Sequence, residues 1–144
     1  MNSEPVYTGK CFCGAVELSA AGAPAVMGYC HCSSCRQWSA GPVNALSLWP
    51  KDKVRITKGA DNVASYSKTP QSIRKWCKNC GGHLLTEHPS WGLTDVYAAI
   101  IPELAFEPAL HVHYQETVLR LHDGLPKQAD LPKEMGGSGR LLPE

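Results

Sequence analysis

Three cysteines stand close together in the sequence, at Cys30, Cys32 and Cys35. Packing does not explain this run, because three small side chains bury little area and crowd three reactive thiols together. Metal ligation does explain it, since Zn²⁺ binds thiolates at about 2.3 Å in a tetrahedron and three protein ligands leave one corner to water or substrate. The run predicts an open, catalytic zinc site. The alternative is a second structural site completed by a histidine, for which the candidates are His83, His88, His111, His113 and His122.

The other four cysteines form two pairs, Cys11 with Cys13 and Cys77 with Cys80. Residues two apart in an extended segment face the same side, so Cys11 and Cys13 can point at one metal ion. The two-residue gap of the second pair, with glycines after it, is typical of a zinc knuckle. Together the pairs predict a closed four-thiolate zinc that serves folding and links two distant parts of the chain. The alternative is four buried thiols or a disulfide.

Two polar residues beside the three-cysteine run are candidates for substrate binding. Arg36 follows the run, and a guanidinium group recognises a carboxylate through two parallel hydrogen bonds. Its other interpretation is a surface charge that compensates the thiolates. His31 lies between Cys30 and Cys32 and points away from them in an extended segment, so we expect it to move a proton near the site rather than to bind the same ion.

Short strands and turns must position these residues, because β-type residues recur between Gly, Pro, Asn and Ser and no long helical pattern occurs. We expect about nine strands, near residues 16–18, 25–29, 43–49, 53–57, 63–68, 73–76, 84–85, 95–101 and 110–114. A single helical turn is expected at residues 36–40. The predicted class is mainly β, a single zinc-stapled domain of short antiparallel strands with little helix.

Composition bounds the organisation and the partners. With 144 residues, 43% of them hydrophobic, the chain suits one core, and we expect one domain at residues 1–126 and a Pro/Gly-rich surface tail at 127–144. The net charge of +1 and the absence of a basic block argue against nucleic acid and anionic membrane as partners. Without a signal sequence or an apolar span, and with an odd number of cysteines, the expected location is the reducing cytoplasm.

Five features of the sequence form one larger pattern: Gly9-x-Cys11-x-Cys13-Gly14-x-Val16-x-Leu18, Cys30-His31-Cys32-Ser33-x-Cys35-Arg36, Cys77-x-x-Cys80-Gly81, His111, and Asp123-Gly124-Leu125-Pro126. This pattern runs from about Tyr7 to Pro126 and resembles the glutathione-dependent formaldehyde-activating enzyme family, which also includes centromere protein V. Two departures lie outside the cysteine groups. Members commonly have a glycine in the segment Ala98-Ala99 and a tryptophan shortly before the Asp-Gly-Leu-Pro turn.

The resemblance implies a zinc-clamped β-fold, the β-tent, with two zinc ions per chain. The four-cysteine zinc would be structural and the three-cysteine zinc catalytic. The implied activity is a carbon-sulfur lyase that joins glutathione and formaldehyde into S-hydroxymethylglutathione, a detoxification reaction. The expected partners are therefore glutathione or a similar small thiol and a small aldehyde. Two alternatives stay open, an enzyme of this kind for a different carbonyl compound and a non-enzymatic zinc-built interaction module; the sequence also leaves the oligomeric state open.

Overall fold

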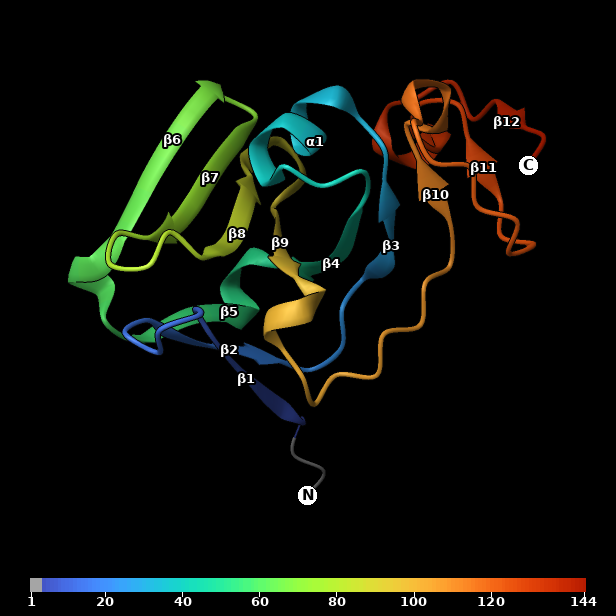
Figure 1. The fold of residues 1–144 in the computed structure, drawn as a ribbon. Helices are drawn as coiled ribbons and strands as arrows, with labels where there is room; N and C mark the ends of the chain where they lie inside the picture. Colours follow the sequence, from blue (N-terminus) through green and yellow to red (C-terminus); the bar gives the residue numbers. More distant parts are fainter. Residues whose placement is uncertain (1–3) are drawn as a thin grey trace. The chain divides into compact units, whose positions relative to one another are not determined.

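The structure is a computed structural model that describes residues 4–144, and its contacts divide the chain into two compact units. The first unit comprises the residues up to Ala25 and Ser47–Phe106, and the second comprises Val26–Leu46 and Glu107–Glu144. The described chain contains twelve strands, most of them antiparallel, and one α-helix (Figure 1). The predicted mainly β class is confirmed. The boundary predicted at residue 126 lies inside the second unit, and the division into domain and tail stays a prediction.

A three-stranded antiparallel sheet in the first unit positions the first cysteine pair, Cys11 and Cys13, which lies in the turn between the first two strands and not in the extended segment expected from the sequence. Its strands are β1 (Val6–Lys10), β2 (Glu17–Ala21) and β5 (Val54–Lys58), in the order β1-β2-β5. Leu18 and Ala20 are fully buried, while Glu17, Ser19 and Ala21 are partly exposed, as the alternation of side chains along a strand requires. This inner face joins a core of Val16, Leu18, Trp49, Leu84, Val96 and Ile101.

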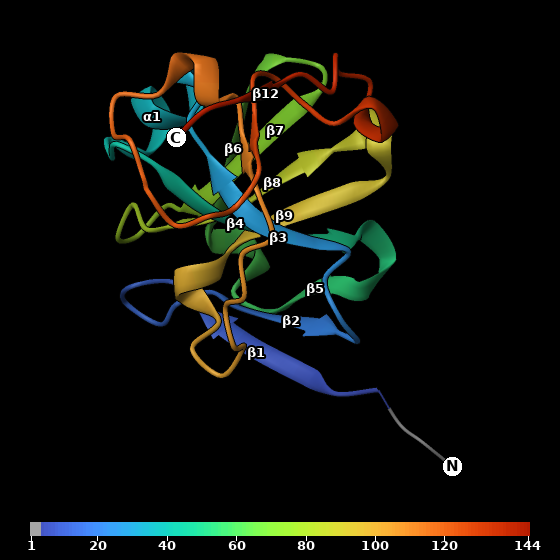
Figure 2. The ribbon, with the colours of Figure 1, turned by 90° about the vertical axis from the view of Figure 1, so that its right-hand side faces the viewer.

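Four successive antiparallel strands in the same unit carry the second pair. They are β6 (Val63–Thr69), β7 (Ser72–Cys77), β8 (His83–His88) and β9 (Leu93–Tyr97), in this order across the sheet (Figure 2). The apolar run expected as a strand to Ile101 is shorter than predicted, because the chain leaves β9 after Tyr97 and forms the 3₁₀ turn η4 (Ala98–Ile100). The other short turns of this unit are η1 (Lys51–Lys53), η2 (Ala60–Asn62) and η3 (Pro89–Trp91).

The second unit holds the three-cysteine run. Its strands β12 (Leu141–Leu142), β11 (Lys127–Gln128), β10 (His111–Val112) and β3 (Val26–Cys30) lie in this order. Strand β10 is parallel to both β3 and β11, and Val112 is paired with Cys30. Between β10 and β11 lies the 3₁₀ turn η5 (Tyr114–Glu116), and η6 (Lys133–Met135) lies between β11 and β12. Strands β11 and β12 and the turn η6 were not among the elements expected from the sequence. Strand β4 (Asn44–Pro50) starts in the second unit and ends in the first.

The single helix, α1 (Ser33–Ser39), grows out of the cysteine run. Cys32 is its N-cap, with the thiol sulfur accepting a hydrogen bond from the Cys35 backbone N–H at 3.3 Å. The helix ends at Ala40, which has a left-handed conformation with φ +57°, directly before Gly41-Pro42. The sequence predicted the stop, but the helix begins three residues earlier than expected because the cap lies within the cysteine run.

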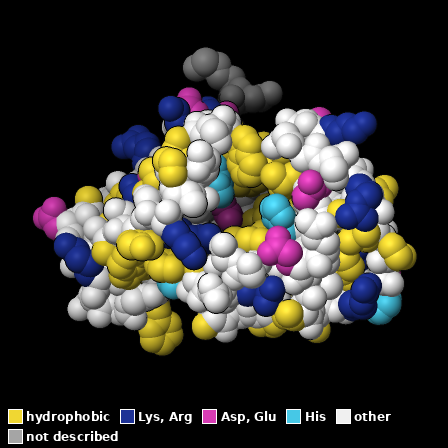
Figure 3. All heavy atoms as spheres, turned by 90° about the horizontal axis from the view of Figure 1, so that it is seen from above, with side chains coloured by type: hydrophobic (Ala, Val, Ile, Leu, Met, Phe, Trp, Pro, Cys, Tyr) yellow, Lys and Arg dark blue, Asp and Glu magenta, His cyan; other side chains and the backbone are white. Residues whose placement is uncertain are grey.

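Charged side chains of both signs are mixed over the face of the molecule in Figure 3, without an extended patch of one sign. No helix among the described residues has the length and apolar character needed to cross a membrane.

Candidate metal centres

The first cysteine cluster, in the first unit, brings together Cys11, Cys13, Cys77 and Cys80. Their sulfur atoms all lie within 4.8 Å of one another. The Cys11–Cys13 distance is 3.7 Å and the Cys13–Cys77 distance is 3.9 Å. Four sulfurs at about 2.3 Å from a central zinc would be separated by about 3.8 Å, the edge of the tetrahedron. The four residues therefore fit a tetrahedral zinc ion.

Hydrogen-bond donors surround these sulfurs. Backbone N–H groups of Val16, Asn79 and Gly82 each donate at 3.3 Å, to Cys11, Cys77 and Cys80 respectively. The Asn79 side-chain amide donates to Cys13 at 3.2 Å, and this bond, together with a backbone hydrogen bond from Ala15, lowers the pKa of that thiol to about 6. Donors aimed at sulfur stabilise the thiolate form that binds a metal.

The second cluster, in the second unit, consists of Cys30, Cys32 and Cys35, whose sulfurs also lie within 4.8 Å of one another. Cys30 and Cys35 are 3.8 Å apart, again the edge of a tetrahedron around zinc. Hydrogen bonds from Cys30, Cys35 and the Cys35 backbone hold the pKa of Cys32 well below its usual range, whereas those to Cys32 and Cys35 raise the pKa of Cys30. Within residues 4–144, no fourth His, Cys, Asp or Glu side chain completes this group.

None of the five histidines considered as a fourth ligand belongs to the three-cysteine group, and His111 and His113 contact other side chains. Both ring nitrogens of His111 contact other side chains, His31 and Asp123. His113 Nδ1 lies 3.5 Å from the Glu116 carboxylate. His122 is exposed, and neither His83 nor His88 joins the three sulfurs in a group of ligand atoms within 4.8 Å of one another. These positions favour the interpretation of the three-cysteine cluster as a site with an open coordination position.

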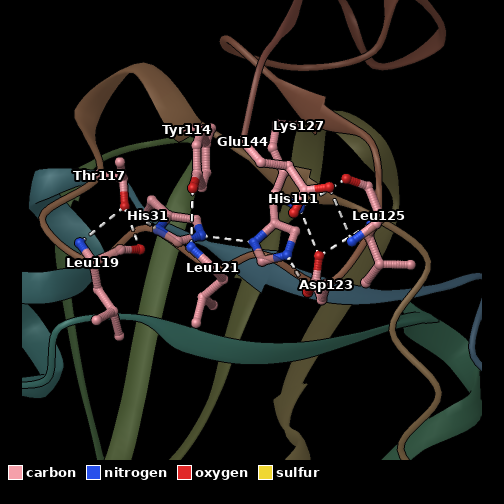
Figure 4. A network of polar contacts seen from close by, with 11 residues as sticks. His31, His111, Tyr114, Thr117, Leu119, Leu121, Asp123, Leu125, Lys127 and Glu144 are labelled. Atoms are coloured by element: carbon pink, nitrogen blue, oxygen red, sulfur yellow. Dashed lines mark hydrogen bonds and ion pairs between the residues drawn. The ribbon is translucent and has the colours of Figure 1, made fainter.

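A network of polar side chains includes His31, the residue between Cys30 and Cys32 (Figure 4). Thr117 Oγ1 lies 2.7 Å from His31 Nδ1, and His31 Nε2 lies 2.8 Å from His111 Nδ1. His111 Nε2 is in turn 2.7 Å from Asp123 Oδ2, and Lys127 Nζ donates to Asp123 Oδ1 at 2.6 Å. Both histidine side chains are fully buried, and the Tyr114 ring packs edge-on against both.

Three titratable groups of this polar network, His31, Asp123 and Lys127, have shifted pKa values; although burial acts against it, the hydrogen bond to Asp123 raises the pKa of Lys127. Burial, assisted by the neighbouring His111, lowers the pKa of His31 to about 4. Burial acts against ionisation of Asp123, but hydrogen bonds from Lys127 and His111 outweigh it and hold its pKa well below the usual range. Asp123 is therefore an ionised carboxylate that accepts hydrogen bonds, and His31 is a neutral ring.

Hydrogen bonds connect Glu116, at the end of the η5 turn, to the cysteine run and to Arg36, which follows it. Glu116 Oε1 accepts a hydrogen bond from the Ser33 backbone N–H at 3.0 Å. Arg36 donates through Nε to the His31 carbonyl at 3.0 Å and through Nη2 to the Glu116 carbonyl at 2.9 Å. The structure thus engages Arg36 and His31, the two predicted substrate residues, in contacts within the second unit. Their role toward substrate stays a prediction.

Sequence reasoning missed several residues of this region, namely Tyr114, Glu116, Thr117 and Lys127. A signal existed for Asp123, which belongs to the Asp-Gly-Leu-Pro turn, and for His111, but nothing in the local sequence pairs either with His31. For Lys127 the residue type itself was misleading. A lysine is normally expected at the surface, because it is almost never fully buried unless it is paired, whereas Lys127 is buried.

Comparisons with known proteins agree with these features. A family model described as "Glutathione-dependent formaldehyde-activating enzyme" matches residues 6–128. An uncharacterized lyase of Schizosaccharomyces pombe is 36% identical over 77 residues, which are 54% of this chain and 54% of that protein. A Podospora anserina protein named as a putative glutathione-dependent formaldehyde-activating enzyme is 27% identical over 124 residues, 82% of this chain and 58% of the relative.

This chain thus spans little more than half the length of these curated relatives. Among solved structures, a Rhodobacter sphaeroides protein from structural genomics has a similar fold, with a TM-score of 0.55 and 24% identity, over 68% of this chain and 90% of that one. The match of the family model covers most of the sequence. The chain belongs to the glutathione-dependent formaldehyde-activating enzyme family.

Proposed function

We propose that this chain is a zinc-dependent carbon-sulfur lyase that joins glutathione, or a related small thiol, to formaldehyde or another small carbonyl compound. In the type reaction the glutathione sulfur forms a bond to the aldehyde carbon, and the thiol proton ends on the carbonyl oxygen. The product is S-hydroxymethylglutathione, and no atom is lost. The names of the relatives, one a lyase and others putative formaldehyde-activating enzymes, support this class of reaction.

The observation that carries the proposal is the difference between the two cysteine clusters. Cys11, Cys13, Cys77 and Cys80 supply all four corners of a tetrahedron, whereas Cys30, Cys32 and Cys35 supply three. A closed site suits folding and an open one suits chemistry. We assign a structural zinc to the first cluster and a catalytic zinc to the second.

The residues of the second unit would share the work as follows. Cys30, Cys32 and Cys35 would hold a zinc ion, which would supply a fourth position that suits sulfur and would stabilise an incoming thiol in its ionised form. Cys32, with its depressed pKa and the N–H of Cys35, supplies a sulfur that is ready to bind metal. The contacts of Glu116 and Arg36 keep the run from Cys30 to Cys35 in one conformation, so that orientation contributes to the rate.

The test compares zinc content with catalysis in two cysteine variants. Wild type should hold two zinc ions per chain, bind glutathione saturably at millimolar concentration and accelerate the exchange between free and S-hydroxymethyl glutathione seen by NMR. Cys35→Ser should lose one zinc and the acceleration and keep a cooperative unfolding transition. Cys13→Ser removes a ligand of the other cluster and should lower the unfolding midpoint strongly.

Other results would overturn the proposal. An exchange rate that is the same with wild type, with Cys35→Ser and without protein would exclude the type reaction, and a panel of other small aldehydes would then test the broader carbonyl chemistry. Two bound zinc ions with no affinity for any small thiol would favour a non-enzymatic zinc-binding module.

A further inference from the structure

His31 is held by hydrogen bonds on every polar atom. Its backbone N–H donates to the Val112 carbonyl at 3.1 Å, and its carbonyl accepts from Arg36 Nε at 3.0 Å. Its ring nitrogens contact Thr117 and His111 at 2.7 and 2.8 Å. Because Cys30 and Cys32 are its direct neighbours, fixing this residue limits the directions in which both thiols can point.

The hydrogen bonds from Thr117 through His31 and His111 to Asp123 have a direction that Asp123 determines. The Asp123 carboxylate can only accept, so the proton shared with His111 lies on His111 Nε2. If each ring carries one proton, His111 Nδ1 must accept from His31 Nε2–H. His31 Nδ1 must then accept from the Thr117 hydroxyl, which has a second possible acceptor in the Leu119 carbonyl at 2.8 Å.

We propose that Asp123 and Thr117 are positioning residues for the three-cysteine cluster: with His111 they fix the tautomer and the ring of His31, and this holds Cys30 and Cys32 ready to bind a metal. The inference rests on the proposed metal at Cys30, Cys32 and Cys35. It adds to that proposal residues that touch neither the metal nor the substrate.

Asp123→Asn gives a sharp test because Lys127 dictates how the new amide must lie. Asp123 Oδ1 accepts from Lys127 Nζ at 2.6 Å and from the Leu125 N–H at 3.0 Å. An asparagine oxygen would stay with these two donors, so its NH₂ group would face His111 Nε2. Every hydrogen bond along the chain would then reverse, and Thr117 would donate to the Leu119 carbonyl instead of to His31.

The first measurement locates the ring protons by ¹H–¹⁵N NMR of histidine-labelled protein. We expect Nε2–H on both His31 and His111 in the wild type, and Nδ1–H on both in Asp123→Asn. A wild-type His31 that carries its proton on Nδ1, or an unchanged tautomer in a folded Asp123→Asn variant, would overturn the assignment. The measurement needs neither thiol nor aldehyde, so its failure is distinct from failure of the proposed reaction.

The second measurement is the affinity of each cysteine cluster for Co²⁺, read from the thiolate charge-transfer absorption, with Cys35→Ser defining the signal of the four-cysteine cluster. Loss of a hydrogen-bond partner of a metal ligand typically costs about tenfold or more in affinity. Thr117 contacts His31, the residue between two of the ligands, and not a ligand itself, so Thr117→Val should weaken the three-cysteine cluster by up to about tenfold and leave the other unchanged. Thr117→Ser, which keeps the hydroxyl, should restore the affinity.

Tyr114→Phe is the matched control. It removes a hydroxyl that binds the Leu121 N–H at 3.0 Å but leaves the aromatic packing on both histidine rings. Its cobalt affinities should equal those of the wild type. Equal weakening in Tyr114→Phe and Thr117→Val, or no weakening in Thr117→Val, would overturn the positioning role. Absence of cobalt from the three-cysteine cluster of the wild type would overturn both this inference and the proposed function, whereas cobalt binding without any glutathione reaction would contradict the proposed function alone.

Discussion

Lys127 Nζ lies 2.6 Å from Asp123 Oδ1, and the lysine side chain is fully buried. The same Nζ donates to the Leu125 carbonyl at 2.9 Å and lies 3.5 Å from the Glu144 carboxylate. A buried ammonium group is tolerated only when its charge and its donors are matched, and these three oxygens match it. The contact therefore joins strand β11, near the C-terminal end of the chain, to the turn that presents Asp123 to His111.

Replacing Lys127 by methionine should destabilise the second unit. The change keeps the length of the side chain but leaves Asp123 without its cation, and breaking a buried ion pair typically costs about 3–5 kcal/mol. We expect a loss near the lower end of this range, because the Asp123 side chain is 34% exposed. Urea unfolding at neutral pH measures it. Lys133→Met, at an exposed lysine, should change stability by less than about 0.5 kcal/mol, and equal losses in both variants would contradict the importance of the pair.

Gly59 should tolerate no side chain. It has φ +76°, and a Cβ atom there would lie 2.0 Å from the Ala15 carbonyl oxygen, which is part of the backbone and cannot move aside cheaply. Gly59→Ala should therefore lower the free energy of unfolding by clearly more than the roughly 1 kcal/mol expected from a left-handed conformation alone.

Gly92→Ala is the matched control, since Gly92 has φ +64° but nothing within 4 Å of the added Cβ atom. Its loss should stay near about 1 kcal/mol. Thermal unfolding of the two variants compares strain with clash directly. A smaller loss at Gly59 than at Gly92 would mean that the close approach to Ala15 is not maintained in solution.

The sequence predicted the parts of the site that are encoded locally. The cysteine groups could be recognised because ligands two or three residues apart share one face of a strand or turn, and the structure brings each group together. The alternation around Leu18 likewise predicted β2. These features depend on neighbours in the sequence, so that spacing alone is informative.

Long-range contacts account for what the sequence did not predict. Strand β10 has only two residues and exists because His111 and Val112 pair with β3, about eighty residues earlier in the chain. No periodic pattern can develop over two residues. Thr117 follows the η5 turn and Lys127 begins the two-residue strand β11. A threonine or a lysine in a polar segment is normally interpreted as solvent-exposed.

Asp95 should make the stability of the first unit depend on pH. Burial raises the pKa of this carboxyl to about 7. The hydrogen bond from the Ser47 N–H at 3.2 Å and the charge of Arg74 both lower the pKa, but burial outweighs them. The folded state therefore prefers the protonated acid. The stabilisation from this raised pKa is fully present below the ordinary pKa of 3.8. It declines as the pH rises and is lost above about pH 7.

Asp95→Asn should remove this dependence, since a neutral amide can still accept the Ser47 hydrogen bond. The difference in urea midpoint between Asp95→Asn and wild type should shift in favour of the variant between pH 5 and pH 8. Comparing the two proteins at each pH cancels the titration of the cysteines, which both share. A difference that does not vary with pH would mean that Asp95 is ionised throughout.

Arg36 offers a test between a structural and a substrate role. Its Nε group donates to the His31 carbonyl, within the cysteine run, and its Nη2 group donates to the Glu116 carbonyl, in the η5 turn. A lysine keeps the charge but cannot reproduce this planar, two-point contact. Arg36→Lys should therefore weaken cobalt binding at the three-cysteine cluster and lower the unfolding free energy by about 1–2 kcal/mol, the value of one or two lost hydrogen bonds.

Arg140→Lys, at an exposed arginine, controls for the substitution itself. If Arg36 instead binds a substrate carboxylate, Arg36→Lys should raise the KM for glutathione while metal affinity and stability stay at wild-type values, so that measuring KM and cobalt affinity on the same preparation separates the two roles.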